Sequence, residues 1–497
     1  MKKKINGWFD QSSLSKWEWI FAVCIMVILS SFYIYGDLEE TTASGINVWK
    51  CIEAGKLYAF DSQLYPGVEN SWIVDGVRGG AYDFFVYIIF AIYNFPMWIW
   101  EKITGLSVFA TWPTRIYIKG ITWIFSGISA LLVYKIALLC KVEKKNANWC
   151  VALFLSCGLF AYTQVVVGGY DIISVAFTLL GIYEYLKERT TRFLISFSMA
   201  IAFKLFAFWI FIPLLLLRDK KIQTLIWKTA ASFSVVVAPR LCFFLVGGRG
   251  GVKTNTLIVN SSIHSSIVNE FLFAEGEGYT SALIKLKDMP LFFVGVFFLW
   301  IFCYWKKEAD ARECIYICFI SMSVFFLFAK VHPYWIILLV PYLSLIMIFN
   351  ISKLNQNMLL EALLSISYVC RMVICWPRCC SLNLIYYMVQ PQKLLEFHWP
   401  ENTGITIYIM GLQRIFAHLS VLSGISLENI AGLFGAVFVV SLLLFLWVNF
   451  PNEQCEKDIN GEPLRIKKYI YIRFVVALGI GLLPAMGYLL WKLFSVI

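Results

Sequence analysis

Long apolar runs separated by short polar stretches fill the sequence from residue 17 to residue 491. A transmembrane helix needs about 20 mostly apolar residues, and many of the runs approach that length. The pattern therefore predicts an all-α polytopic membrane protein with about 11–14 transmembrane helices. The runs that fit best are 17–35, 115–140, 149–167, 171–186, 226–246, 289–305, 314–330, 334–349, 358–375, 428–449 and 469–491.

Composition supports this class and excludes others. Hydrophobic residues make up 60% of the chain and charged residues 15%, against about 45–50% and about 25% in soluble domains. A soluble globular protein could not bury so much apolar surface, so soluble enzymes, disordered proteins and disulfide-built secreted domains are excluded. The 14 cysteines lie mostly inside the apolar runs and are expected to be small buried hydrophobic side chains.

The net charge of +11 does not indicate a nucleic-acid partner, because the basic residues form short clusters between the apolar runs. Clusters of this kind at helix ends are typical of the cytoplasmic loops of membrane proteins. We therefore expect membrane lipid around the chain and no bound nucleic acid. The clusters are Lys2–Lys4, Lys141–Lys145, Lys187–Arg192, Arg218–Lys221, Lys306–Lys307 and Lys467–Lys468.

Run 193–217 is unusual, because it has basic clusters at both ends and Lys204 in its middle. A single crossing would place one cluster outside, against the positive-inside rule. Two half-length helices that meet at Lys204 would keep both clusters in the cytoplasm and place Lys204 near the outer face. By the same reasoning, run 83–100 is expected to be an interfacial or partly inserted helix. One large external loop, 36–113, then follows the first span.

This external loop contains acidic residues that are candidates for catalysis. Asp37 follows the first apolar run within two residues. A carboxylate where membrane meets water can have a raised pKa and act as a general base, although a solvated acid at a helix end is the simpler interpretation. Glu39 and Glu40 follow it, and the three acids could also hold a divalent cation, which the sequence does not require. Asp83 is the next candidate base.

Asp171 and several cations are predicted to lie on the same outer face. Asp171 begins an apolar helix, where an acid in the first turn also complements the helix dipole. Lys204 is surrounded by apolar residues, and burying its ammonium costs about 2.5–3.5 kcal/mol, so it needs an anion, a cavity or an interface. Lys330 and His332 lie at a helix corner, and Arg249 lies in a glycine-rich turn. Cations at this depth suit the phosphate of a lipid-linked substrate.

The chain resembles the GT-C superfamily of integral-membrane glycosyltransferases, which use polyprenyl-phosphate-linked sugars. Four features carry the resemblance, and they occur in the family's order along the chain. They are Asp37-Leu38-Glu39-Glu40 after the first span, Gly169-Tyr170-Asp171 at a helix start, Phe203-Lys204 before an apolar run with Pro213 and Arg218, and the corner Lys330-Val331-His332-Pro333-Tyr334.

Two elements of the family pattern differ here. The Glu-Arg pair of the family's corner is Pro333-Tyr334 in this chain. Any phosphate contact expected from that Arg must come from elsewhere, with Lys330 or Arg249 as candidates. The Pro-Pro-Leu-Tyr type of element expected near the second helix is replaced by residues that include Tyr82 and Asp83.

The resemblance implies a catalytic transmembrane module over residues 1–350, with residues 351–497 as additional transmembrane helices. It implies a cell-membrane protein with its active site on the extracytoplasmic face, which transfers a sugar to a glycan or lipid acceptor by one inverting displacement. The implied roles are Asp37 as general base and Lys204, Lys330, His332 and Arg249 as donor-phosphate ligands. Acceptor or metal candidates are Glu39, Glu40, Asp83 and Asp171.

Two other kinds of membrane protein remain alternatives. A transporter or lipid flippase usually shows paired repeats with broken helices at the bilayer midplane, and the hydropathy pattern here shows no such two-fold symmetry. A surface-polysaccharide polymerase or ligase tends to have its large external loop in the second half of the chain, whereas here it lies in the first quarter. The donor sugar and the acceptor are not specified by the sequence.

Overall fold

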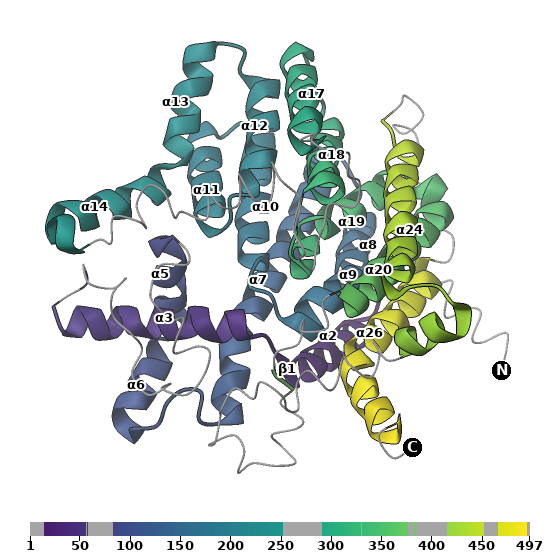
Figure 1. Cartoon of the computed structure of the whole chain (residues 1–497). Helices are drawn as coiled ribbons and strands as arrows, with labels where there is room; N and C mark the ends of the chain where they lie inside the picture. Colours follow the sequence, from purple (N-terminus) through teal and green to yellow (C-terminus); the bar gives the residue numbers. More distant parts are fainter. Residues whose placement is uncertain are drawn as a thin grey trace.

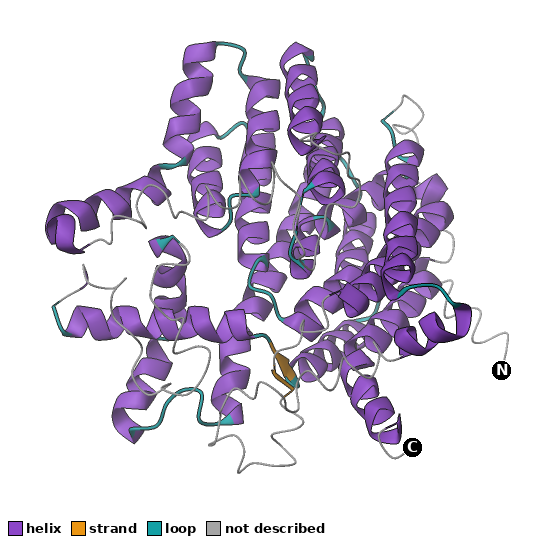
Figure 2. Ribbon diagram, in the orientation of Figure 1, coloured by secondary structure: helices purple, strands orange, loops and turns teal. Residues whose placement is uncertain are grey.

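The computed structural model describes residues 14–55, 57, 83–251, 291–329, 331–375, 382–383, 415–451 and 466–494. Figure 2 shows that helices make up nearly all of this part of the chain. The strand pair within it, β1 (Tyr33–Ile34) with β2 (Leu382–Asn383), is antiparallel and only two residues long. The all-α class predicted from the sequence is confirmed.

The elements run in the following order, and Figure 1 shows their arrangement. The first group is α2 (Lys16–Ser30), α3 (Gly36–Glu53), α5 (Phe84–Tyr93), α6 (Phe95–Thr104), α7 (Trp112–Leu139), α8 (Lys144–Leu155), α9 (Gly158–Phe160), the π-helix η2 (Ala161–Val167), α10 (Ile172–Leu186), α11 (Thr190–Phe203), α12 (Ala207–Arg218), α13 (Ile222–Ser232) and α14 (Ser234–Gly251). The second group is α17 (Leu291–Trp305), α18 (Ala311–Phe328), η4 (Pro333–Leu338), α19 (Val340–Phe349), η5 (Ile351–Lys353), α20 (Leu354–Cys375), α24 (Leu427–Val448) and α26 (Ile466–Phe494).

Several helices are long and apolar enough to cross a membrane. Within the described residues there are four: α7, α18, the η5–α20 run and α24. Two bent pairs, α5 with α6 and α8 with α9–η2, raise the number to six if each pair is one span, and α10, α11, α12, α17 and η4–α19 are shorter apolar helices. The protein is therefore a polytopic helical membrane protein, as the apolar runs predict.

Three predicted spans differ in detail from the structure. Helix α2 ends at Ser30, so the run to residue 35 is completed by β1 rather than by helix. The run 149–167 bends by 46° between α8 and α9–η2. The run 226–246 is divided into α13 and α14 at Phe233, where Ser198 of α11 accepts a hydrogen bond from the Val235 N–H. This serine caps the start of α14 from another helix, which a local pattern does not reveal.

Run 83–100 is not a straight crossing helix. Helices α5 and α6 meet at Asn94 with a bend of 61°. Pro96 lies in the first turn of α6, where proline is tolerated, whereas in the interior of a continuous helix it would break the hydrogen-bond ladder. The bend agrees with the predicted interfacial or partly inserted helix, whose depth in the membrane stays a prediction.

The predicted break at Lys204 is confirmed. Lys204 ends α11 in an extended conformation, with φ −153° and ψ 130°, and α12 begins three residues later. The Ser174 hydroxyl near the start of α10 donates to the Ala200 carbonyl, 3.1 Å away. At the other end, the Arg218 guanidinium donates to the Tyr185 carbonyl. Helices α11 and α12 therefore form a hairpin whose turn contains Lys204 (Figure 1).

The basic clusters Lys187–Arg192, Arg218–Lys221 and Lys306–Lys307 lie at the opposite end of the bundle from Lys204, and Lys2–Lys4 lies outside the described residues. Lys135 and Lys187 both lie over the Tyr183 ring near the end of α10, at 5.9 and 4.5 Å from its centroid. The Tyr304 hydroxyl at the end of α17 donates to the Lys220 carbonyl, 3.2 Å away. We call this the basic end, and the other the Lys204 end. The arrangement agrees with the expectation that these basic loops share one side of the membrane.

Helix α3 lies across the direction of α5 and α10 at the Lys204 end (Figure 1). It packs closely on α5, because Gly45 has no side chain. A Cβ at Gly45 would lie 2.7 Å from the Cβ of Phe90. The Trp49 indole N–H also donates to the Ala91 carbonyl, 2.7 Å away. These contacts fix the position of α3, whose first turn contains the candidate base Asp37.

The C-terminal helices pack against the earlier part of the chain. The Tyr368 hydroxyl in α20 donates to the Pro333 carbonyl, 2.8 Å away. The Arg473 guanidinium in α26 lies 3.2 Å from a carboxylate oxygen of Glu361 in α20. The division into a module over 1–350 and additional helices over 351–497 stays a prediction.

Candidate functional site

Asp37 lies in the first turn of α3, where its carboxylate complements the helix dipole. The chain leaves α2, forms β1 and then begins α3 at Gly36, so the half-buried Asp37 side chain lies where these three elements meet. The Tyr334 hydroxyl, from the start of η4, donates to Oδ2 of Asp37 at 3.3 Å. Residues almost 300 positions apart thus meet at the candidate base.

Asp171 and Lys204 form a buried ion pair at the same end. The Lys204 Nζ lies 3.3 Å from Oδ1 of Asp171, and the two side chains are 9% and 1% exposed. Lys204 also lies 5.3 Å from the Tyr170 ring centroid and 5.8 Å from that of Trp335. Because a buried charge is stable only when it is paired, Asp171 does more than complement the dipole of α10.

The two acidic residues lie close together. The Tyr334 hydroxyl donates to Oδ2 of Asp37. An added Cβ at Gly169 would lie 3.5 Å both from Oδ2 of Asp171 and from the Tyr334 side chain, so Tyr334 lies between the two acids. Asp37, Asp171, Lys204 and Tyr334 therefore form one group, which we call the carboxylate–lysine cluster.

His332 lies at the exposed edge of this cluster. Its ring is stacked on the Tyr334 ring, with centroids 5.7 Å apart, and meets the Trp335 ring edge to face, with centroids 4.7 Å apart. Trp335 therefore contacts both His332 and Lys204. Lys330 lies outside the described residues, and Arg249 lies in α14, where its side chain is not described.

Asp83 occupies the N-cap position of α5. The next turn of α5 packs against the end of α11, since the Phe85 and Phe203 rings are 5.6 Å apart. Asp83 thus begins a helix that borders the Lys204 turn. Its role as a candidate base stays a prediction.

Glu39 and Glu40 have different surroundings. Oε1 of the buried Glu39 lies 2.8 Å from the Arg115 guanidinium. Glu40 is half-buried, and burial together with the charge of Asp37 raises its pKa from 4.5 to about 7. In the part of the chain that the structure describes, no group of three or more His, Cys, Asp or Glu side chains could hold a metal ion.

Sequence reasoning did not assign Arg115, Lys119 or Tyr334 to the site. The first two are charged residues in an apolar run, which is itself a signal of function or of buried pairing. Tyr334 occurs in the corner motif, but its partner Asp37 is too distant in sequence for a local pattern to reveal. The hydrogen bond between the Tyr334 hydroxyl and the Asp37 carboxylate is seen only in the folded structure.

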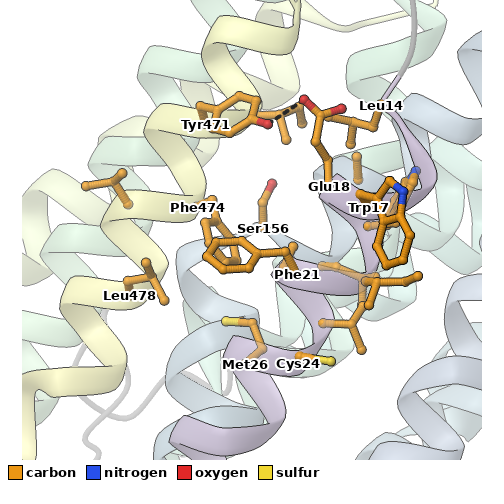
Figure 3. Close-up of a pocket in the computed structure, with 18 of the residues that line it drawn as sticks. Leu14, Trp17, Glu18, Phe21, Cys24, Met26, Ser156, Tyr471, Phe474 and Leu478 are labelled. Atoms are coloured by element: carbon orange, nitrogen blue, oxygen red, sulfur yellow. Dashed lines mark hydrogen bonds between the residues drawn. The ribbon is translucent and has the colours of Figure 1, made fainter.

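An apolar groove lies elsewhere and is distinct from the cluster. It has a volume of about 770 Å³ and is lined mainly by α2, α26 and the α8–η2 segment. Figure 3 shows Glu18 and Tyr471 at one end of it, joined by a hydrogen bond of 2.7 Å. Glu18 is in the first turn of α2, whereas Asp37 follows the last turn. The polar end of the groove is therefore remote from Asp37.

The cluster combines two kinds of chemistry. The Asp37 carboxylate accepts a hydrogen bond from a neutral phenol, so it can act as a base toward a hydroxyl group. The Lys204 ammonium is held in place by Asp171 and aromatic rings, so it can bind an anion. A reaction in which a hydroxyl group attacks and an anionic group leaves would use Asp37 as the base and Lys204 as the anion-binding cation.

The sequence has no match among family models or curated proteins, whereas the fold is similar to a solved structure. No family model matches the sequence, and no curated protein matches it. Among solved structures, the fold is similar to the crystal structure of ArnT from Cupriavidus metallidurans bound to undecaprenyl phosphate. The two chains are 11% identical, with 92% of this chain and 78% of that chain covered and a TM-score of 0.43.

Proposed function

We propose that this protein is an integral-membrane glycosyltransferase that moves a sugar from a polyprenyl-phosphate donor to a hydroxyl group of a glycan or lipid acceptor. The observation that carries the proposal is the carboxylate–lysine cluster. It brings Asp37, the candidate base, close to Lys204, the cation best placed for a phosphate. The resemblance of the same residues to the GT-C motifs supports this pairing.

In this mechanism Asp37 accepts the proton of the acceptor hydroxyl while that oxygen attacks the anomeric carbon. The bond from the anomeric carbon to the lipid-phosphate oxygen breaks, and its electron pair leaves with the phosphate. Lys204, with His332 at the edge, stabilises the charge that develops on the departing lipid phosphate. One displacement inverts the anomeric configuration and needs no covalent glycosyl-enzyme.

Tyr334 and Asp171 act through these two residues. The Tyr334 hydrogen bond to one oxygen of Asp37 orients the carboxylate, which leaves the other oxygen for the acceptor. Asp171 pairs with the Lys204 ammonium and directs it within a largely apolar region. The site lies at the end of the bundle opposite the basic loops, so we place it on the extracytoplasmic face.

The proposal is tested with purified protein, a panel of polyprenyl-phosphate hexoses and pentoses, and a glycan and lipid extract that supplies acceptor hydroxyl groups, by following the release of free polyprenyl phosphate. We expect release by the wild-type protein and its loss in Asp37→Asn. Glu53→Gln is the matched control, because Glu53 is an exposed acid on the same helix, paired with Lys102 away from the cluster. Equal release by wild type and Asp37→Asn, or no release from any donor, would contradict the proposal.

A further inference from the structure

Helix α7 carries two buried cations in its first two turns. Arg115 and Lys119 are four residues apart, so they lie on the same face of the helix. Both residues are 2% exposed. Burying charges in a membrane protein is costly, and such residues are retained where they have a structural or functional role.

Lys119 binds the chain on the N-terminal side of Asp37. Its Nζ lies 2.7 Å from the Ser30 carbonyl, at the end of α2, and 2.7 Å from the Tyr33 carbonyl in β1. A third contact of 3.0 Å reaches the Val165 carbonyl in η2, the element that leads to Asp171. An ammonium has three N–H donors, and these three carbonyls can accept all of them.

The loop before Asp171 is shaped to admit Lys119. Gly168 has φ +72°, a conformation that side chains rarely adopt, and an added Cβ would lie 2.5 Å from Cε of Lys119. Two independent constraints therefore favour glycine at this position. One turn further along α7, the Trp123 indole N–H donates to the Ser30 hydroxyl at 2.6 Å, which adds a second contact to the end of α2.

Arg115 binds the chain on the C-terminal side of Asp37. Its guanidinium lies 2.8 Å from Oε1 of Glu39, two residues beyond Asp37. Its Nε also donates to the Phe109 carbonyl at 2.8 Å, in the segment that leads into α7. The two cations of α7 therefore hold the backbone before Asp37 and the side chain just after it.

We propose that Arg115 and Lys119 are positioning residues that fix Asp37 relative to Asp171 and Lys204. Neither cation has to contact the substrate for this role. Lys119 ties the segment before Asp37 to η2, and η2 leads directly to Asp171. The inference rests on the proposed role of Asp37 as general base. Misplacing a reacting group by about 1 Å can reduce the rate about 100-fold.

Two variants test this role in different ways. Lys119→Met removes the ammonium and keeps an unbranched apolar side chain. Gly168→Ala retains Lys119 but pushes it away from its carbonyls. Gly127→Ala is the matched control, because Gly127 is on the same helix α7 and an added Cβ there meets nothing within 4 Å.

We expect kcat to fall about 10- to 100-fold in Lys119→Met and Gly168→Ala, with the donor KM within about twofold of wild type, since Lys204 still binds the phosphate. Hydrogen–deuterium exchange of the purified proteins should rise in peptides that cover residues 31–42 and stay unchanged in those that cover 172–186. Gly127→Ala should match wild type in both measurements.

A general structural role would instead lower the amount of folded protein and leave kcat of the folded fraction unchanged. Unchanged exchange over 31–42, or a change confined to KM, would also overturn the proposal. The exchange measurement needs no activity. If wild type shows no transfer while Lys119→Met raises exchange over 31–42, the positioning by α7 stands and the proposed function fails.

Discussion

The ammonium of Lys204 lies 3.3 Å from the carboxylate of Asp171 and is 9% exposed. Lys204 therefore does not extend along the outer surface of the bundle toward lipid. It is a cation held inside the protein by one acid and two aromatic rings. A phosphate that enters the cluster would compete with Asp171 for the same ammonium. Lys204 would then pair with Asp171 when the site is empty and with the phosphate when the donor is bound.

Lys204→Ala should weaken donor use about 10- to 100-fold, because a charge-assisted hydrogen bond contributes about 1.5–3 kcal/mol. The variant also leaves Asp171 as an unpaired buried charge, which is destabilising by about 3–5 kcal/mol. Lys204→Arg should not restore activity, since a planar guanidinium needs more room than an ammonium. Donor KM and thermal unfolding of each variant measure the two effects.

The double variant Lys204→Ala, Asp171→Asn separates binding from stability. Removing both charges should recover most of the lost stability without recovering donor use. If the double variant also regains wild-type transfer, Lys204 serves only to neutralise Asp171 and has no role in binding the phosphate.

Asp37→Asn should lower turnover about 10²- to 10⁴-fold, the range expected for the loss of a general base. The affinity for the lipid-phosphate donor should change little, because the base acts on the acceptor. Tyr334→Phe should have a milder effect, about 10-fold on kcat, since a hydrogen bond to a charged carboxylate contributes about 1.5–3 kcal/mol and this one is long, at 3.3 Å. Steady-state kinetics with a saturating acceptor distinguish these cases, and near wild-type transfer by Asp37→Asn would make Asp83 the next candidate.

Glu40 should make stability depend on pH. Burial and the Asp37 charge raise its folded-state pKa from 4.5 to about 7, so between these values the folded protein binds more protons than the unfolded chain. Stability from this group is complete below about pH 4.5 and is lost as the pH rises through about 7, an effect on the order of 3 kcal/mol. The apparent Tm of wild type should decline over this interval, and Glu40→Gln should remove that part of the decline. Identical pH profiles for the two proteins would contradict the assignment.

The sequence predicts the parts of this structure that follow from local pattern and charge. The break at Lys204 follows from basic clusters on both sides of an apolar run, because the positive-inside rule constrains both ends. The pairing of Lys204 with Asp171 does not follow, since an Asp at a helix start is also explained by the helix dipole. The partners of Lys119 are three backbone carbonyls, and a backbone carbonyl has no sequence signature.

The side of the membrane on which the cluster lies can be tested with single cysteines. His332 is exposed at the Lys204 end, and Lys221 is exposed at the basic end. In a background in which Cys24 and Cys242, the exposed cysteines of the described residues, are replaced by serine, His332→Cys should react with a membrane-impermeant thiol reagent in intact cells. Lys221→Cys should react only after the cells are permeabilised, because loops rich in Lys and Arg stay in the cytoplasm. Lys141→Cys, in another basic loop, should behave as Lys221→Cys does. The reverse pattern would place Asp37 and Lys204 on the cytoplasmic side, where a donor in the outer leaflet could not reach them, and the proposed direction of transfer would be wrong.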